Sequence, residues 1–184
     1  MPLNAQNMPT KFQFKTDRLL LTPVSSDDEN ELHGIFTDQH VRRYLLDDEI
    51  VPQEFTHTEI ENSQISFEKN DYGLWMIRRS GEQKILGFCG YRPFYEPPEL
   101  QILYGLLQDF WGNGYAAEAT KALIKYGFET LQFEEIIAAT DPPNEASVRV
   151  MERVGMAFDK RVEKNGADTI YYKIKSIDYS DYNL

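Results

Sequence analysis

A stretch near the middle of the chain, where a glycine-containing segment separates two elements of different periodicity, constrains the fold most strongly. Residues 99–107 alternate between the two faces of a half-buried strand. After Gly112 and Gly114, apolar residues recur at helical spacing from Ala117 to Leu131. The glycines therefore lie where a strand passes into a helix N-terminus. Free amides and the positive end of the helix dipole meet there, so this segment can bind an anion.

Glycine at both positions would let the backbone turn tightly and would leave the N–H groups open to a ligand phosphate. The segment lacks the Gly-Lys-Ser/Thr of a P-loop and the third glycine of a dinucleotide-binding fold. Taken by itself, it is equally compatible with a structural glycine turn. Motifs elsewhere in the sequence distinguish these two interpretations.

Four short motifs occur in order between residues 16 and 175. They are Thr16-Asp17-Arg18-Leu19-Leu20-Leu21, then Trp111-Gly112-x-Gly114-Tyr115-Ala116-x-Glu118-Ala119, then Asn144-Glu145-Ala146-Ser147, and finally Glu152-Arg153-Val154-Gly155-Met156. In these motifs the sequence resembles the GNAT acetyltransferases, and within them the branch of ribosomal-protein N-terminal acetyltransferases.

The resemblance implies an α/β fold with a central mixed, mostly antiparallel sheet, flanked by helices and containing a splayed strand pair that binds acyl-CoA. It also implies an enzyme, an N-acetyltransferase that moves an acetyl group from acetyl-CoA to a primary amine. The α-amine of a protein or peptide is the favoured acceptor. A small-molecule amine acetyltransferase and a non-catalytic acyl-CoA-binding module remain the alternatives.

The same resemblance implies the cofactor site. The backbone around the two glycines would hold the CoA phosphates, amides at the end of the preceding strand would bind pantetheine and the thioester carbonyl, and Ser147 would lie near the sulfur. Two positions depart from the family pattern, Asp109 at the first position and Asn113 where relatives often have a cation. The expected cofactor-binding residues are Tyr104, Gly105, Leu106, Leu107, Asp109, Trp111, Gly112, Asn113, Gly114, Tyr115, Ala116, Asn144 and Ser147.

The catalytic residues are harder to assign. Gln101 occupies the position at which many relatives have a glutamate base, and it can position a water but cannot take a proton. Glu99 shares its strand face and is the substitute base, or else a solvated carboxylate. An α-amine could also arrive neutral, since its pKa is about 7.7–8.0. Met151 stands where many relatives have a tyrosine acid, so Ser147 is the candidate acid, or simply the start of a helix.

Charge and cysteine content exclude other classes of function. The net charge of −11 and the pI near 4.7 argue against a nucleic-acid or anionic-membrane partner and suit a cationic acceptor or simple solubility. The acidic tracts 26–29 and 47–49 fall in the region expected to frame the acceptor.

Cys89, the only cysteine, is interpreted as a buried strand residue in a reducing compartment. We therefore expect a cytoplasmic protein, monomeric or homodimeric, with no signal peptide or membrane span. His33, His40 and His57 have no metal-ligand spacing, which predicts no metal.

One domain is expected over residues 14–184, after a flexible extension of residues 1–13. Pattern and turn signals order its elements as β-α-α-α-β-β-β-α-β-α-β-β. Strands are predicted at 15–23, 72–79, 84–92, 99–107, 134–140, 156–163 and 168–175. Helices are predicted from about 25, at 39–46 and 54–70, after residue 114, and at 144–155, and a tight turn is predicted at 164–167.

Overall fold

An eight-stranded mixed sheet forms the centre of the structure, with the strand order β1-β2-β3-β4-β5-β6-β8-β7. This computed structural model describes residues 10–95, 98–164 and 166–179. The strands are β1 (Phe14–Lys15), β2 (Leu19–Pro23), β3 (Leu74–Arg79), β4 (Ile85–Phe94), β5 (Glu99–Leu106), β6 (Glu135–Thr140), β7 (Ala157–Lys164) and β8 (Ala167–Lys175). Neighbouring strands run antiparallel except β5 and β6, which are parallel.

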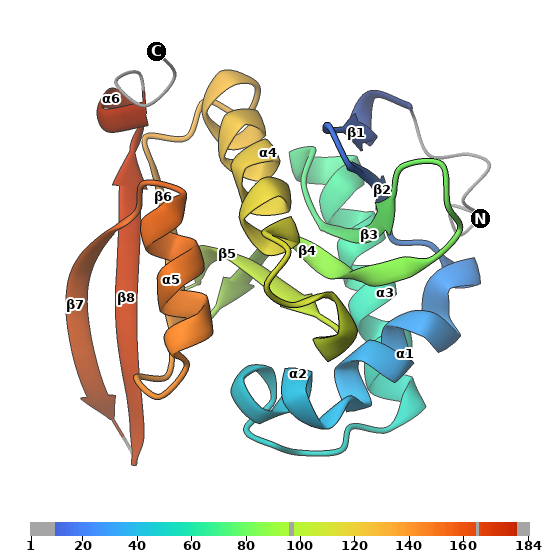
Figure 1. The fold of residues 1–184 in the computed structure, drawn as a ribbon, viewed down its shortest axis with the longest axis horizontal. Helices are drawn as coiled ribbons and strands as arrows, with labels where there is room; N and C mark the ends of the chain where they lie inside the picture. The colour runs from blue at the N-terminus through green and yellow to red at the C-terminus, as the bar shows by residue number, and fades with distance from the viewer. Residues whose placement is uncertain (1–9, 96–97, 165, 180–184) are drawn as a thin grey trace.

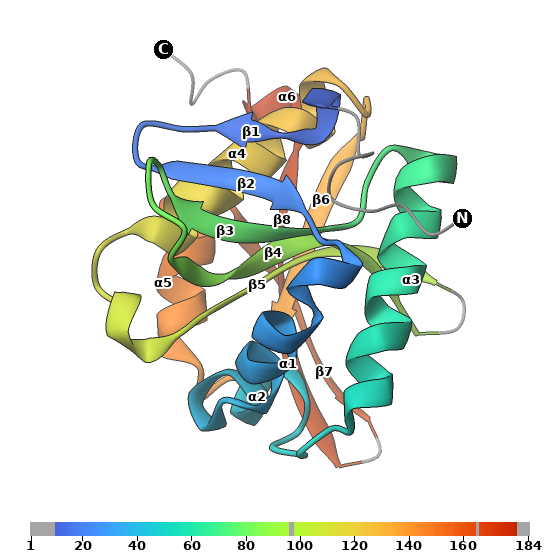
Figure 2. The ribbon, with the colours of Figure 1, turned by 90° about the vertical axis from the view of Figure 1, so that its right-hand side faces the viewer.

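Helices cover both faces of this sheet (Figure 1). The α-helices are α1 (Glu29–Thr37), α2 (Gln39–Leu45), α3 (Gln53–Asn70), α4 (Tyr115–Glu129), α5 (Glu145–Arg153) and α6 (Ser176–Tyr179), and short 3₁₀ helices occupy Thr10–Phe12, Ser26–Asp28 and Gln108–Phe110. Figure 2 shows α1, α2 and α3 in front of the strands, with α4 and α5 behind them.

The two faces hold two separate hydrophobic cores. Successive strand residues point to opposite faces, so Trp75 and Met76, neighbours in β3, belong to different cores. Trp75 packs with the α4 side, which includes Leu123, and Met76 packs with Phe36 and Phe88 on the α1–α3 side. Burial on both faces explains why the central strands are almost continuously apolar.

The predicted fold class is confirmed. The elements follow the predicted order, except that the single strand predicted at 15–23 is divided into two paired strands, β1 and β2. The described part of the chain begins at Thr10. Phe12, which falls within the predicted flexible extension, is buried, and its carbonyl accepts a hydrogen bond of 2.6 Å from the Trp75 indole. Strand β4 continues through Pro93 to Phe94, which pairs with Glu99. Helix α6 carried no sequence signal. Most of the predicted extension and Asn165, in the predicted tight turn, lie outside the described residues.

The sheet parts between β5 and β6. Eight residue pairs join β4 to β5, whereas β5 and β6 are in register only at Gln101 and Ile137. From Gln101 onward β5 therefore turns one edge away from the rest of the sheet, as the splayed pair in the sequence-based prediction requires. The connection from β5 to α4 begins at the open end of this gap.

Two residues of the first acidic tract, Asp28 and Glu29, make contacts within the fold, whereas Ser26 and Asp27 are exposed. Asp28 accepts hydrogen bonds from the backbone and side chain of Ser25, at 2.9 and 2.8 Å, and forms an ion pair with Arg78 of β3. Glu29 of α1 lies 2.9 Å from Nδ1 of His57 in α3, and Glu61 lies 3.4 Å from its Nε2. These pairs join the N-terminal helices to one another and to the sheet.

The His57 contacts predict a pH-dependent contribution to stability. The hydrogen bond to Glu29 raises the pKa of His57 above its usual value and lowers the pKa of Glu29. A raised folded-state pKa stabilises the fold at pH values below the unfolded-state pKa, and the contribution disappears as pH rises through the folded-state value. Thermal melts should show wild type exceeding His57→Gln in Tm by roughly 1–2 °C at pH 6.

The same difference should vanish at pH 9. A suitable control is His40→Gln, because His40 contacts the Gln39 amide rather than an acid. A Tm difference for His57→Gln that does not change between the two pH values would show that its ion pair contributes nothing.

Candidate functional site

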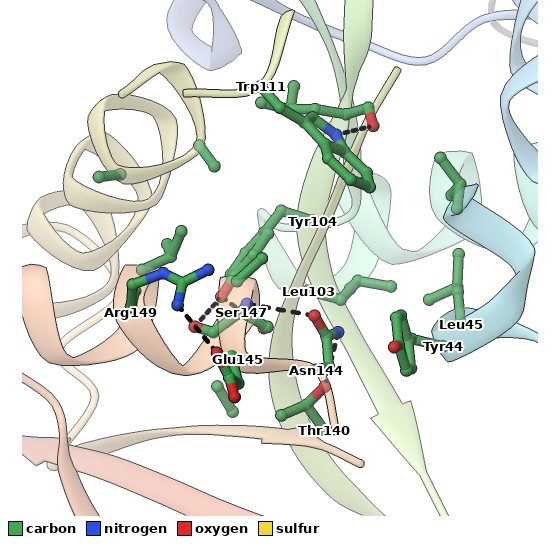
Figure 3. Close-up of a pocket in the computed structure, with 18 of the residues that line it drawn as sticks. Tyr44, Leu45, Leu103, Tyr104, Trp111, Thr140, Asn144, Glu145, Ser147 and Arg149 are labelled. Atoms are coloured by element: carbon green, nitrogen blue, oxygen red, sulfur yellow. Dashed lines mark hydrogen bonds and ion pairs between the residues drawn. The ribbon is translucent and has the colours of Figure 1, made fainter. Parts of the chain in front are cut away.

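The gap between β5 and β6 opens into a cavity of about 720 Å³. Its walls are α2, the end of β5, the glycine segment with the start of α4, the end of β6, and α5 (Figure 3). Elements that are far apart in the sequence thus surround one space. Tyr44, Leu45 and Leu103 form an apolar wall opposite Ser147 and Arg149.

The glycine segment has the backbone that its sequence predicts. Gly112 and Gly114 have φ angles of +74° and +77°, in the left-handed region that favours glycine. Gly114 immediately precedes Tyr115, the first residue of α4, so the free N–H groups of this helix begin at the cavity. The indole of Trp111 donates a 2.7 Å hydrogen bond to the Leu106 carbonyl, which ties the segment to the end of β5.

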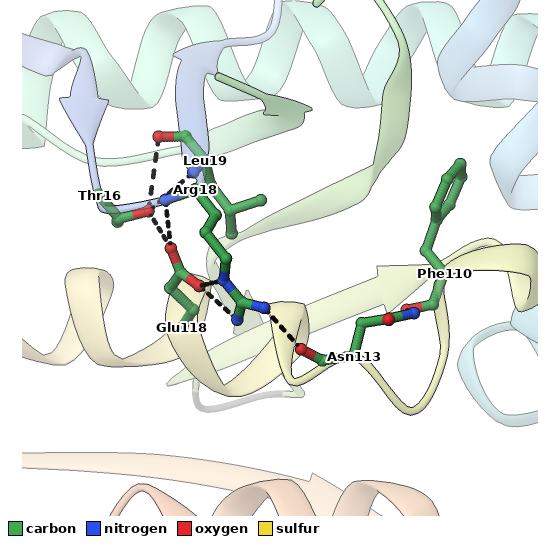
Figure 4. A network of polar contacts seen from close by, with 6 residues as sticks. All are labelled: Thr16, Arg18, Leu19, Phe110, Asn113 and Glu118. Carbon is green, nitrogen blue, oxygen red and sulfur yellow. Dashed lines mark hydrogen bonds and ion pairs between the residues drawn. The ribbon is translucent and has the colours of Figure 1, made fainter. Parts of the chain in front are cut away.

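A charged brace holds this segment from the outside (Figure 4). Arg18, which directly precedes β2, donates to the Asn113 carbonyl at 2.9 Å and through its Nε to Glu118 of α4 at 2.7 Å. Glu118 also accepts hydrogen bonds from the Arg18 backbone and the Thr16 hydroxyl. Burial opposes the ionisation of Glu118, but these donors outweigh it and lower its pKa. Thr16, Arg18 and Glu118 belong to two of the sequence motifs, which the brace joins.

The free amides of β5 are fewer than predicted. The Leu107 amide donates to the Leu86 carbonyl at 3.0 Å, so it is not available to a ligand. In an antiparallel pair, alternate residues direct their N–H groups to opposite sides. Counting back from Leu107, the amides of Leu106 and Tyr104 face the gap and that of Gly105 faces β4. Of the four predicted amides, two therefore remain for a ligand strand.

Arginines of α5 supply positive charge that the sequence analysis missed. Arg149 and Arg153 both line the cavity. A Cβ atom added at Gly114 would lie 3.6 Å from Nη2 of Arg18 and 3.7 Å from Nη1 of Arg153. The glycine thus lies between two guanidinium groups, which can offset the absence of a cation at Asn113. Arg153 stands in the last motif, and that position was the signal available to find it.

A hydrogen-bonded chain crosses the cavity wall from β6 to β5. Asn144 donates to the Thr140 hydroxyl at 2.9 Å and accepts from the Ser147 amide at 3.2 Å, which caps α5 as predicted. The Ser147 hydroxyl lies 2.8 Å from the Tyr104 hydroxyl. Burial raises the pKa of Tyr104 to about 12, with the Ser147 bond acting weakly in the other direction, so the phenol is protonated at neutral pH.

Most of the predicted cofactor residues line this one cavity, and three do not. Leu107, Asp109 and Asn113 do not line the cavity. The Asn113 carbonyl instead accepts the hydrogen bond from Arg18. The predicted residues that line the cavity are Tyr104, Gly105, Leu106, Trp111, Gly112, Gly114, Tyr115, Ala116, Asn144 and Ser147.

Neither of the two predicted acid–base residues on β5 lines the cavity. Gln101 is 4% exposed and donates a 2.9 Å hydrogen bond to Glu99, and the Glu99 carboxylate lies 3.9 Å from Lys160. Met151, at the position of the tyrosine acid in relatives, is fully buried in the core. Cys89 is also fully buried, which raises the pKa of its thiol and makes it a structural residue rather than a nucleophile.

Within residues 10–95, 98–164 and 166–179, His, Cys, Asp and Glu side chains form no group of three that could hold a metal ion. None of the helices in the described part of the chain combines the length and the apolar content that crossing a bilayer requires.

Comparison with known proteins agrees with this geometry. The family model described as "Acetyltransferase (GNAT) domain" matches residues 18–157. The uncharacterized protein YkkB of Bacillus subtilis (strain 168) is 33% identical over 176 residues, which cover 92% of this chain and 99% of YkkB.

Solved structures share the fold. A GNAT-family acetyltransferase from Bacillus anthracis has a TM-score of 0.75 at 24% identity and covers 90% of this chain and 99% of its own. RimL, a ribosomal L7/L12 alpha-N-protein acetyltransferase solved in complex with coenzyme A, has a TM-score of 0.73 at 17% identity, with 87% and 95% covered. The chain belongs to the GNAT family, as an acetyl-CoA-dependent acetyltransferase.

Proposed function

We propose that the enzyme acetylates primary amines, and that its acceptor is the α-amine of a protein or peptide. The observation that carries this proposal is the scarcity of bases in the cavity. Among the described lining residues the titratable bases are Glu145, which is paired with Arg149 at 3.2 Å, and His40, whose Nε2 lies 3.2 Å from the Gln39 amide nitrogen. Gln101 replaces the usual glutamate. An α-amine, with a pKa of about 7.7–8.0, is about half neutral near pH 8, whereas a lysine side chain with a pKa near 10.4 is almost fully protonated there.

The cavity residues suit the steps of such a transfer. The amine nitrogen attacks the thioester carbonyl carbon, and the Tyr104 and Leu106 amides stabilise the charge that develops on its oxygen. The carbon–sulfur bond then breaks and its electron pair leaves with the sulfur, to which the Ser147 hydroxyl donates a hydrogen bond. The proton lost from nitrogen leaves through solvent. Glu99 remains a predicted base that would act through a water near Gln101.

A small polyamine is the second candidate, and one cluster of charge favours it. Burial raises the pKa of Asp141, and the neighbouring Asp47 and Asp168 raise it further. Asp141 follows Thr140, which lines the cavity, and Asp47 belongs to the second acidic tract. Negative charge at this end would attract a cationic acceptor. The first tract offers less attraction, since Asp28 and Glu29 are paired with Arg78 and His57.

Substitution of Gly114 tests whether the backbone around Gly112 and Gly114 binds the CoA phosphates. Gly114→Val places a side chain between the guanidinium groups and the amides that a phosphate would reach, so the Kd for acetyl-CoA measured by calorimetry should rise at least about tenfold. Valine at a positive φ also strains the backbone.

The strain has a matched control in Gly81→Val, because Gly81 has a φ of +80° and no neighbouring atom within 4 Å of its added Cβ. Both variants should lose similar thermal stability, while Gly81→Val keeps its affinity. If Gly114→Val binds acetyl-CoA with a Kd within a factor of about two of wild type, the glycine segment is not the phosphate-binding site.

Substitution of Ser147 tests the departure of the thiolate. Ser147→Ala should lower kcat about tenfold and leave the KM for acetyl-CoA within a factor of about two, because the lost donor matters mainly in the transition state. Single-turnover thiol release would establish that chemistry limits the rate. An unchanged kcat under those conditions would show that Ser147 has no role in thiolate departure and serves only at the start of α5.

An acceptor panel tests the substrate class. Thiol release from acetyl-CoA should be fastest with peptides that have free α-amines and should be lost when the α-amine is blocked while a lysine is retained. If Asp47 and Asp141 attract the acceptor, kcat/KM for basic peptides and spermidine should fall several-fold between about 0.02 and 0.5 M salt, with neutral peptides unaffected. If spermidine is acetylated faster than every peptide, the acceptor is a polyamine rather than a peptide α-amine.

A further inference from the structure

Tyr104 has a side chain that the backbone role of β5 does not require. The strand needs only the Tyr104 amide at the gap, yet its phenol extends along the cavity to α5, where its hydroxyl lies 2.8 Å from Oγ and 3.2 Å from the carbonyl oxygen of Ser147. Figure 3 shows the two side chains meeting at the cavity wall beside α5. This contact joins β5 to α5 across the parted region of the sheet.

The contact matters because it determines where the Ser147 proton points. Ser147 has one hydroxyl proton, and its amide is already bonded to Asn144. If the phenol donates to Oγ, the serine proton is free to point into the cavity. If the phenol donates instead to the Ser147 carbonyl, the serine can donate back to the phenol oxygen and its proton is occupied.

We propose that Tyr104 is a positioning residue for Ser147, donating a hydrogen bond to Oγ so that the serine hydroxyl is directed at the departing CoA sulfur. The inference rests on the proposed function, since it gives Ser147 the role described there. No proton leaves the phenol, because its raised pKa of about 12 keeps it protonated. Tyr104 thus acts by fixing the direction of the serine O–H.

A double-mutant cycle tests this coupling. Tyr104→Phe keeps the ring and its packing and removes only the hydroxyl, so it should lower kcat about fivefold to tenfold while the Kd for acetyl-CoA stays within a factor of about two. In the Ser147→Ala background the same substitution should have little further effect, because the group it positions is gone.

Tyr126→Phe is the matched control. It removes another phenol hydroxyl, one that donates to the Asp71 carbonyl at 2.6 Å and lies away from the cavity. This variant should change Tm and leave kcat unaltered.

Slow hydrolysis of acetyl-CoA without an amine should be measured alongside, because attack by water expels the same thiolate. Absence of amine acetylation in wild type would contradict the proposed acceptor, whereas hydrolysis would still decide the role of Tyr104. An unaltered rate in Tyr104→Phe, or an equal loss with and without Ser147, would overturn the inference.

Discussion

The parting of β5 from β6 is the constraint on which the rest of the structure depends. Strand amides that lack a partner are costly when buried, so a sheet that opens in its centre needs something to occupy the gap. Here the gap becomes a cavity, and the Tyr104 and Leu106 amides face it. An extended pantetheine chain can pair with such an edge as a strand would. We therefore propose that the cofactor, when bound in this gap, completes the sheet.

Holding the gap open requires that both walls be fixed independently. On one side, Trp111 binds the Leu106 carbonyl and the Arg18–Glu118 brace attaches the glycine segment to β2. On the other, Asn144 links β6 to the first turn of α5 through Thr140 and Ser147. Ligand-binding groups held by a rigid scaffold bind without the cost of ordering them first.

Charge is divided across the cavity despite the acidity of the chain. Arg18 and Arg153 lie beside Gly114, where we propose that the CoA phosphates bind, and Arg149 also lines the cavity. Asp141 and Asp47, in contrast, follow the ends of β6 and α2. The net charge of −11 thus describes the surface as a whole and not the cofactor site. Local potential, rather than net charge, governs what a cleft attracts.

The sequence by itself determined the order of the elements, the glycine segment at the head of α4 and the cap at Asn144, because periodicity, glycine and capping residues act over a few neighbouring positions. The family motifs predicted the cofactor-binding segment from the same local stretches of sequence. Only the tertiary structure decided which amides of β5 remain free, since that depends on the register with β4. It also decided that Gln101 and Glu99 lie outside the cavity and that the Tyr104 phenol meets Ser147, because strand twist and helix packing bring together residues 43 positions apart.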